Sequence, residues 1–221
     1  MMEFDRVRND EQRKIRVQQI KNAAIKLFDN EPFHEIDLTK IANETSFTRG
    51  NLYKYISSKE EIYLLVVLDE INDWVSDLRN TFNADMTHAV TDFSQQWTQV
   101  VYRHQRFLKL ISLLFTTIEQ KVSLESLVNF KKQLSIELFE LSKVVKTVFP
   151  TWDDHHTNKF LRLQMYHAIG LFSATSPSQL QQEAIEQAGV SFPLPAFVDD
   201  FSEFISYTVH YLNSSLAQDQ S

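Results

Sequence analysis

Residues 37–59, DLTKIANETSFTRGNLYKYISSK, contain two short stretches with helical spacing, separated by a break. Asp37 is expected to cap the first helix, Leu38 to Thr45, because a side-chain oxygen at this position accepts otherwise unpaired backbone N–H groups. Thr48 is expected to cap the second helix in the same way, and this helix runs through Tyr55. Two short helices joined by a tight turn are typical of a DNA-reading helix-turn-helix.

The second of these helices carries side chains that suit DNA. Leu52 and Tyr55 are spaced to face the core, which leaves the other residues of the helix facing outward. Arginine prefers guanine, asparagine can pair with adenine, and threonine, tyrosine and lysine suit phosphate oxygens. Gly50 costs the helix about 1 kcal/mol of stability relative to alanine. A close approach of the backbone to DNA would explain why a glycine stands at this position. The outward candidates are Thr48, Arg49, Gly50, Asn51, Tyr53 and Lys54.

Each of these residues also has a purely structural interpretation. Asp37 and Thr48 could act only as helix caps, and Tyr55 could serve only core packing. The polar residues of the second helix could form an ordinary solvated face. The sequence leaves these alternatives open.

The segments on either side of the motif are also predicted to be helical. Residues 11–29 carry apolar side chains at helical spacing, and Pro32 ends this helix because proline disfavours helix in the residue before it. Phe47 is expected to pack as a hydrophobic staple against Leu52. Ser57 or Ser58 is expected to cap a further, long helix.

The stretch 20–67, IKNAAIKLFDNEPFHEIDLTKIANETSFTRGNLYKYISSKEEIYLLVV, resembles the N-terminal domain of the tetracycline-repressor (TetR) family. The marks of the resemblance are AAIKLF, LTKIANETSFTRGNLYKYI and SSKEEI. It implies that the N-terminus of the second helix lies in the major groove and that Tyr53 and Lys59 contact phosphates. Thr39, in the first helix of the motif, is a further candidate for DNA contact.

Asp37 departs from the family pattern, which often has threonine at this position. A carboxylate there would repel a nearby phosphate. The backbone contact that the family usually makes at this position is therefore not expected.

The rest of the 221-residue chain is predicted to be helical as well, because it has only 3 Gly and 5 Pro and no run with period-2 alternation. We expect an all-α fold, with an N-terminal three-helix helix-turn-helix domain of residues 1–57. A larger helical-bundle regulatory and dimerisation domain of residues 58–221 follows it. Phe192-Pro193-Leu194-Pro195 is expected to form an extended link. The predicted helical segments are 86–103, 104–118, 122–149, 154–174, 178–188 and 196–217.

The resemblance implies a C-terminal domain that encloses a ligand cavity and supplies two helices to a dimeric four-helix bundle. An apolar aromatic cavity could be lined by several ring side chains of this region, although each could equally be packed core. These candidates are Trp97, Tyr102, Phe107, Phe115, Phe130, Phe139 and Tyr166.

The helices at 154–174 and 196–217 are the candidates for the dimer bundle, because both carry more apolar positions than one core-facing stripe needs. The alternative is that these positions simply form the core of a single chain. The candidate interface residues are Phe160, Leu163, Phe172, Phe201, Ile205, Val209 and Leu212.

The net charge of −7 is unevenly distributed: residues 1–60 carry a net of +1 and residues 61–221 a net of −8. A near-neutral head can bind DNA if its cations lie on one face. The absence of cysteine excludes disulfides and thiolate metal sites. No signal peptide or membrane-spanning run is evident, which predicts a cytoplasmic protein.

No catalytic constellation is present: there is no HExxH, no glycine-rich phosphate loop and no nucleophile–base set. His155-His156 with His167 or His210 does not make a metal site, because adjacent histidines diverge on a helix and no ligand completes the set. No enzyme activity, metal or cofactor is expected.

These observations predict a DNA-binding transcriptional regulator. We expect a repressor that binds a palindromic operator as a homodimer and is released by a small hydrophobic or aromatic ligand. One alternative is a DNA-bound protein-interaction factor without a ligand. Another is a helical enzyme or ligand carrier whose helix-turn-helix resemblance is accidental.

Overall fold

The fold is all-α in a computed structural model of the chain, as the sequence predicts. Every regular element in the described part of the chain is a helix. No helix in that part is both long enough and apolar enough to cross a membrane. The structure describes residues 2–83, 89–191 and 195–219.

The chain divides into two compact units. The first comprises Met1–Asp69 with Leu113–Gln133, and the second comprises Glu70–Ser112 with Leu134–Ser221. Helices α4 (Lys59–Thr81) and α7 (Leu124–Val148) contribute residues to both units. The predicted functional division at residue 57 stays a prediction.

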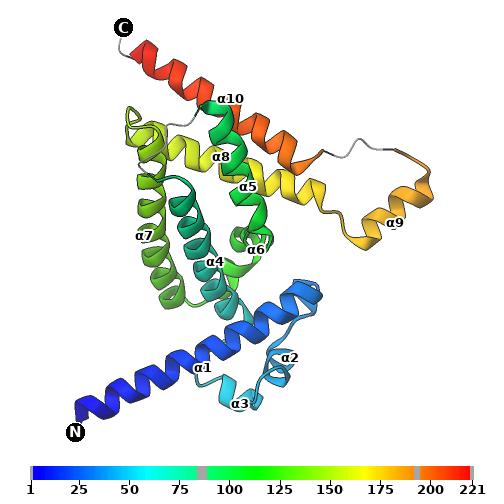
Figure 1. The fold of residues 1–221 in the computed structure, drawn as a ribbon. Helices are drawn as coiled ribbons and strands as arrows, with labels where there is room; N and C mark the ends of the chain where they lie inside the picture. The colour runs from blue at the N-terminus through cyan, green and yellow to red at the C-terminus, as the bar shows by residue number, and fades with distance from the viewer. Residues whose placement is uncertain (1, 84–88, 192–194, 220–221) are drawn as a thin grey trace. The chain divides into compact units, whose positions relative to one another are not determined.

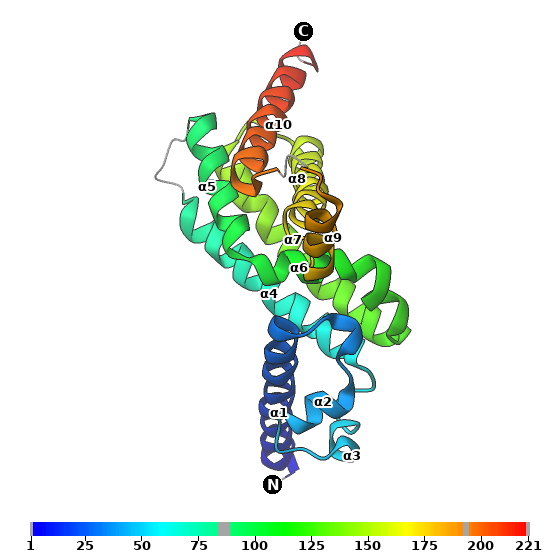
Figure 2. The ribbon, with the colours of Figure 1, turned by 90° about the vertical axis from the view of Figure 1, so that its right-hand side faces the viewer.

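The first unit is built around one long helix, α1, which begins before the predicted residue 11 and ends shortly before Pro32. Figures 1 and 2 both show α1 running alongside α2 and α3. A π-helical turn, η2, and a 3-10 turn, η3, lead into α7. The sequence predicts one continuous helix over 104–118, but its last five residues form the π-helical turn. The bounds are α1 Met2–Asn30, η1 Phe33–Glu35, α2 Leu38–Asn43, α3 Arg49–Leu52, η2 Leu114–Ile118 and η3 Glu119–Lys121.

The core of the first unit forms where one stripe of α1 meets the motif and the start of α4. Ile20 and Ala24 of α1 are fully buried, as are Ile41 of α2 and Leu52 of α3. The buried hydroxyl of Tyr63 in α4 donates to the carbonyl of Ala24 at 2.9 Å. This bond satisfies the only polar atom of the side chain and positions α4 on α1.

Asp37 begins α2 as predicted. Its Oδ1 accepts the backbone N–H groups of Thr39 at 2.7 Å and of Lys40 at 2.8 Å. The N–H of Lys40, more than any other contact, holds the pKa of the Asp37 carboxyl below its usual value of 3.8. The carboxylate thus has a structural role at this position.

The second unit packs α10 (Phe197–Asp219) against α5 (Val90–Arg103) and α8 (Asp154–Thr175). The ring of Trp97 in α5 lies 5.1 Å from the ring of Phe160 in α8. α6 (Gln105–Leu113) follows α5, and α9 (Gln179–Ala188), which has no buried residue, stands apart from the other helices of this unit (Figure 1). Phe192, Pro193 and Leu194 of the predicted extended link lie outside the described residues, as do residues 86–88 of the predicted 86–103 helix.

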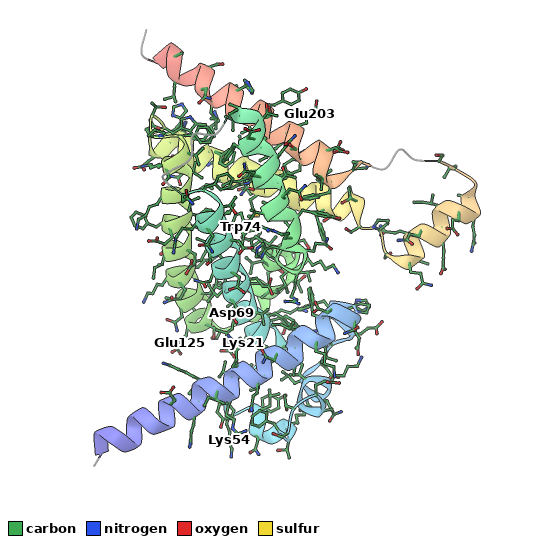
Figure 3. The ribbon with its side chains drawn as sticks, in the orientation of Figure 1. Lys21, Lys54, Asp69, Trp74, Glu125 and Glu203 are labelled. Carbon is green, nitrogen blue, oxygen red and sulfur yellow. The ribbon has the colours of Figure 1, made fainter. Side chains whose placement is uncertain are left out.

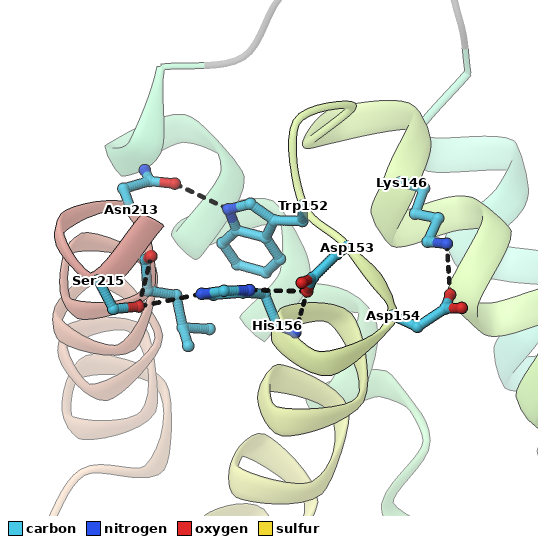
Figure 4. A network of polar contacts seen from close by, with 8 residues as sticks. Lys146, Trp152, Asp153, Asp154, His156, Asn213 and Ser215 are labelled. Atoms are coloured by element: carbon cyan, nitrogen blue, oxygen red, sulfur yellow. Dashed lines mark hydrogen bonds and ion pairs between the residues drawn. The ribbon is translucent and has the colours of Figure 1, made fainter. Parts of the chain in front are cut away.

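A polar network joins the start of α8 to α10 (Figure 4). Asp153 caps α8 by accepting the backbone N–H of His156 at 2.8 Å and also contacts its Nδ1 at 2.7 Å. The other ring nitrogen of His156 lies 3.1 Å from Ser215 Oγ, and Trp152 Nε1 donates to Asn213 Oδ1 at 2.8 Å. These contacts satisfy buried polar groups and fix the pairing of the two helices.

Replacing Asp37 with alanine should lower the free energy of unfolding by about 1 kcal/mol at neutral pH, because two backbone N–H groups lose their acceptor. The folded-state pKa of Asp37 lies below 3.8, so its contribution is present above that pH and is lost as the pH falls through the folded-state pKa. Urea denaturation at several pH values, followed by circular dichroism, measures the gap between the wild type and Asp37→Ala.

Asp37→Asn is the matched control, because asparagine caps a helix as well as aspartate does and does not titrate. The gap between Asp37→Asn and Asp37→Ala should stay constant with pH. A gap between wild type and Asp37→Ala that does not narrow in acid would contradict the assignment.

Candidate nucleic-acid interface

Within the segment from Thr48 to Tyr55, the α-helix is shorter than the sequence predicts. α3 covers only Arg49–Leu52, and hydrogen-bonded turns continue the chain through Tyr55. Thr48 Oγ1 accepts the backbone N–H of Asn51 at 3.3 Å, as expected of a cap. Leu52 is fully buried and Tyr55 half-buried, whereas all six outward candidates are exposed. The segment therefore presents its polar residues on one free surface.

On this surface, the side chains of Arg49 and Tyr53 hold each other in position. Arg49 Nη2 donates to the Tyr53 hydroxyl at 3.2 Å, and its guanidinium lies 5.8 Å from the centre of the Tyr53 ring. This bond raises the pKa of Arg49 above its usual value, so the group stays cationic. Among the described residues, neither the Asn51 nor the Lys54 side chain has a hydrogen-bond or ion-pair partner; Figure 3 labels Lys54. Their donors are free for an external ligand.

Gly50 is not required by the packing of the chain itself. A Cβ added at Gly50 would meet no atom within 4 Å, and its φ is not positive. Alanine would therefore fit this position and favour the helix.

Thr39 and Lys59 differ in how available they are. Thr39 is exposed in the first turn of α2. Lys59 is half-buried and donates through Nζ to the carbonyls of Phe33 at 2.7 Å and of Ile36 at 2.6 Å. Burial lowers the pKa of this ammonium group. Lys59 thus anchors the loop before α2 with two of its three protons, and its phosphate contact stays a prediction.

Two aromatic rings flank the residues from Thr48 to Lys54, which we call the recognition segment. Phe47 directly precedes Thr48, and Tyr55 directly follows Lys54; their ring centres are 6.1 Å apart. Phe47 thus pairs with Tyr55, a contact that the predicted staple did not include. Arg16 of α1 lies 5.1 Å from the centre of the Phe47 ring, and Arg13 lies 6.0 Å from that of Tyr55. We did not predict these contacts, although Arg13 and Arg16 stand at the spacing of the α1 core stripe.

The seven aromatic candidates for a ligand cavity are divided between the two units and differ in burial. Trp97 and Phe107 are buried, and both contact Trp74, at ring-centre distances of 6.3 and 5.2 Å. Phe130 is buried in the first unit, and Phe115 of the same unit is exposed. The remaining three belong to the second unit and are exposed: Tyr102, Phe139 and Tyr166. Their role in ligand binding stays a prediction.

The predicted dimer residues mostly lie inside the second unit. Five of the seven, Phe160, Phe201, Ile205, Val209 and Leu212, are fully buried within a single chain, Phe172 is nearly so, and Leu163 is half-buried. The same two helices carry exposed tyrosines instead: Tyr166 on α8, and Tyr207 and Tyr211 on α10. Interface contacts by the predicted residues stay a prediction.

A polar groove of about 760 Å³ lies between α5 and α10 and was not predicted from sequence. Gln95 and Gln99 line it from α5, and Asp199, Asp200 and Glu203 from α10. The Glu203 carboxylate accepts the Tyr207 hydroxyl at 2.6 Å. In the described part of the chain, no group of three or more His, Asp or Glu side chains is arranged to hold a metal ion.

Comparisons with solved structures place the fold. A putative TetR-family regulator from Mesorhizobium loti is 13% identical, with a TM-score of 0.55 over 92% of this chain and 97% of that chain. A TetR/AcrR-family regulator from Thermobifida fusca is 17% identical, with a TM-score of 0.54 over 86% of this chain and 96% of that chain. Thermus thermophilus FadR, a TetR-family repressor solved in complex with lauroyl-CoA, is 16% identical, with a TM-score of 0.54 over 81% of this chain and 99% of that chain.

No curated protein matches the sequence. The family model described as "Tetracyclin repressor-like, C-terminal domain" matches residues 68–212, which is well over half of the chain. That match lies entirely beyond the stretch 20–67 whose motifs carry the resemblance of the N-terminal segment. The chain belongs to the tetracycline-repressor (TetR) family of transcriptional regulators.

Proposed function

We propose that this protein is a transcriptional repressor that binds a palindromic operator as a homodimer and leaves it when a small apolar ligand binds the second unit. The observation that carries the DNA-binding part is the exposed surface of Thr48 to Lys54. An arginine, an asparagine and a lysine stand there without carboxylate partners among the described side chains.

The two caps of the motif favour different tasks for its two helices. The carboxylate of Asp37 accepts two backbone N–H groups of α2, so this side chain is not proposed to bind a phosphate. α3 instead offers Arg49 and Asn51 near its N-terminus, the end that reads bases in helix-turn-helix proteins. Tyr53, Lys54 and the remaining proton of Lys59 suit the phosphates beside them.

The dimer is proposed to form through the outward face of α8 and α10. Tyr166, Tyr207 and Tyr211 on this face each keep more than half of their surface exposed. Lys159 of α8 donates to the Tyr211 hydroxyl at 3.2 Å, so the two helices present one joined surface. Tyrosines are enriched at protein interfaces because they bury a large ring and keep a polar end.

An apolar effector is proposed to act on the aromatic interior of the second unit. The indole N–H of Trp74 and the hydroxyls of Thr98 and Thr157 are buried and find no hydrogen-bond partner among the described residues. An unpaired buried polar group costs about 1–3 kcal/mol, which a ligand with acceptor groups would recover. The structurally similar FadR is described with lauroyl-CoA, a ligand that combines an apolar chain with polar groups.

A second function is a DNA-bound factor that docks another protein and has no small-molecule ligand. The exposed α9, with Leu180 76% exposed, favours this alternative. The two functions share the DNA interface and differ in what the second unit binds.

Selection of bound duplexes from a random pool should recover a palindrome with half-site centres about 34–36 Å apart, because each protomer presents one recognition helix. Arg49→Ala and Asn51→Ala should each relax the preference at one base pair per half-site, at a cost of about 1–3 kcal/mol. The measurement is the sequence logo of each variant.

Asn22→Ala is the matched control, because Asn22 is an exposed asparagine of α1 that is bonded to Gln18. Its logo should equal that of the wild type. Identical logos for wild type, Arg49→Ala and Asn51→Ala would show that these side chains do not read bases, and a non-palindromic site would contradict the dimer.

Gly50→Ala should have opposite effects on stability and on DNA binding. Stability should rise by up to about 1 kcal/mol, because alanine is the better helix former and its Cβ meets nothing in the protein. Operator affinity should fall if the α3 backbone approaches DNA closely at this point. Thermal unfolding and fluorescence anisotropy with a labelled operator measure the two effects; unchanged affinity with raised stability would remove Gly50 from the interface.

Lauroyl-CoA should lower the operator affinity of the protein and change the fluorescence of its tryptophans, of which Trp74 and Trp97 lie in the aromatic interior. Titration with lauroyl-CoA and, in parallel, with free CoA separates binding of the acyl chain from binding of the nucleotide part. Operator binding that neither compound affects would contradict an acyl thioester as the effector and favour the alternative function.

A further inference from the structure

The core-facing side of α1 changes its chemistry along the helix. Ile20, Ala24 and Leu27 are buried on this face. Arg16 and Arg13, four and seven residues before Ile20, continue the same face towards the N-terminus, because residues at these spacings line one side of a helix. Both arginines are exposed. The stripe therefore becomes basic where α1 passes the recognition segment.

The guanidinium group of each of the two arginines lies over a ring at one end of that segment. Arg16 lies 5.1 Å from the centre of the Phe47 ring, next to Thr48. Arg13 lies 6.0 Å from the centre of the Tyr55 ring, next to Lys54. The two rings hold both guanidinium groups beside the residues that face the groove in the proposed function.

The contact with a ring leaves the hydrogen-bond donors of a guanidinium available. A cation–π contact pairs none of the five N–H donors of the group with an acceptor atom. Arg16 uses one of them on Gln19 Oε1 at 3.2 Å. The remaining donors suit the oxygens of a phosphate, which arginine can bind in a bidentate manner.

Several other cations of the first unit are paired with carboxylates. Lys21 pairs with Asp69 at 2.5 Å, Lys26 with Glu44 at 2.5 Å and Lys40 with Glu31 at 2.6 Å; Figure 3 labels the first pair. Among the described side chains, Arg13 and Arg16 have no carboxylate within 4.0 Å. Arg13 acts on the Glu61 carboxylate at longer range and contributes to its lowered pKa. Among the described side chains, the cations of α1 that form no ion pair therefore include the two positions beside the recognition segment.

We propose that Arg13 and Arg16 form a second DNA-contacting element, outside the helix-turn-helix, that binds phosphates of the strand bordering the groove which α3 enters. This inference rests on the proposed function. The major groove is about 12 Å wide and a helix with its side chains about 10–12 Å across, so groups beside the recognition helix reach the bordering phosphates. Phosphate contacts of this kind fix the register of the protein without reading sequence.

The test is the salt dependence of DNA affinity for Arg13→Ala, Arg16→Ala and the double variant. Each lost phosphate contact should lower the slope of log affinity against log salt by about 0.9, because fewer counterions are released. The affinities for the selected operator and for a random duplex should fall by the same factor. Arg16→Lys should keep the slope, because the lysine retains the charge.

Lys26→Ala is the matched control: it removes one charge from the same helix, and that charge is already paired with Glu44. Its salt slope should equal that of the wild type. Circular dichroism of all variants should be unchanged, because the replaced side chains are exposed.

The outcomes separate the inference from the proposed function. Wild-type protein that binds no duplex overturns both. Wild-type protein that binds its operator while Arg13→Ala and Arg16→Ala keep the wild-type slope overturns only the phosphate contacts. Weaker binding with an unchanged slope would also overturn them, since the arginines would then act only by supporting Phe47 and Tyr55.

Discussion

The recognition segment depends on contacts outside itself, because a helix of four residues cannot be stable alone. Nucleating a first helical turn in water is unfavourable, and isolated helices shorter than about 12 residues are marginal. α3 is held by the Thr48 cap, by the burial of Leu52 and by the rings of Phe47 and Tyr55. Because neighbouring residues hold the segment, Arg49, Asn51 and Lys54 need make no core contact and can remain exposed.

The chain that follows the recognition segment is held in place by the carboxylate of Glu61. Glu61 Oε2 accepts the backbone N–H of Ser57 at 2.8 Å and also its hydroxyl, while Oε1 accepts the Ser126 hydroxyl at 2.7 Å. Both oxygens of Glu61 are thereby engaged, and the Ser57 hydroxyl and N–H are the largest of the contacts that keep its pKa low against the effect of burial. Within the first unit, the end of the helix-turn-helix is linked in this way to the start of α7.

The sequence was sufficient to predict features that depend on neighbouring residues in the chain. It was insufficient to predict which aromatic side chains are buried and which are exposed. Asp37 and Thr48 were predictable as caps because their side chains act on backbone groups two or three residues away. The aromatic residues were not assignable in this way, since Trp97 and Tyr166 have similar periodic surroundings but are 0% and 61% exposed. The π-helical turn at Leu114–Ile118 has no marker in the sequence, because a π-helix differs from an α-helix by one residue in hydrogen-bond register.

For the proposed DNA binding, the ion pairing of individual cations matters more than the net charge of the protein. A net charge of −7 predicts repulsion from DNA at long range, but the Debye length is only about 8 Å at physiological salt. Within that distance of a phosphate, the charges beside the recognition segment decide the interaction. Among the described side chains, Lys26 and Lys40 form ion pairs with carboxylates, whereas Arg49 and Lys54 form none. In the proposed function, the acidic remainder of the chain would weaken non-specific association with DNA, and binding to an operator would depend on this small group of unpaired cations.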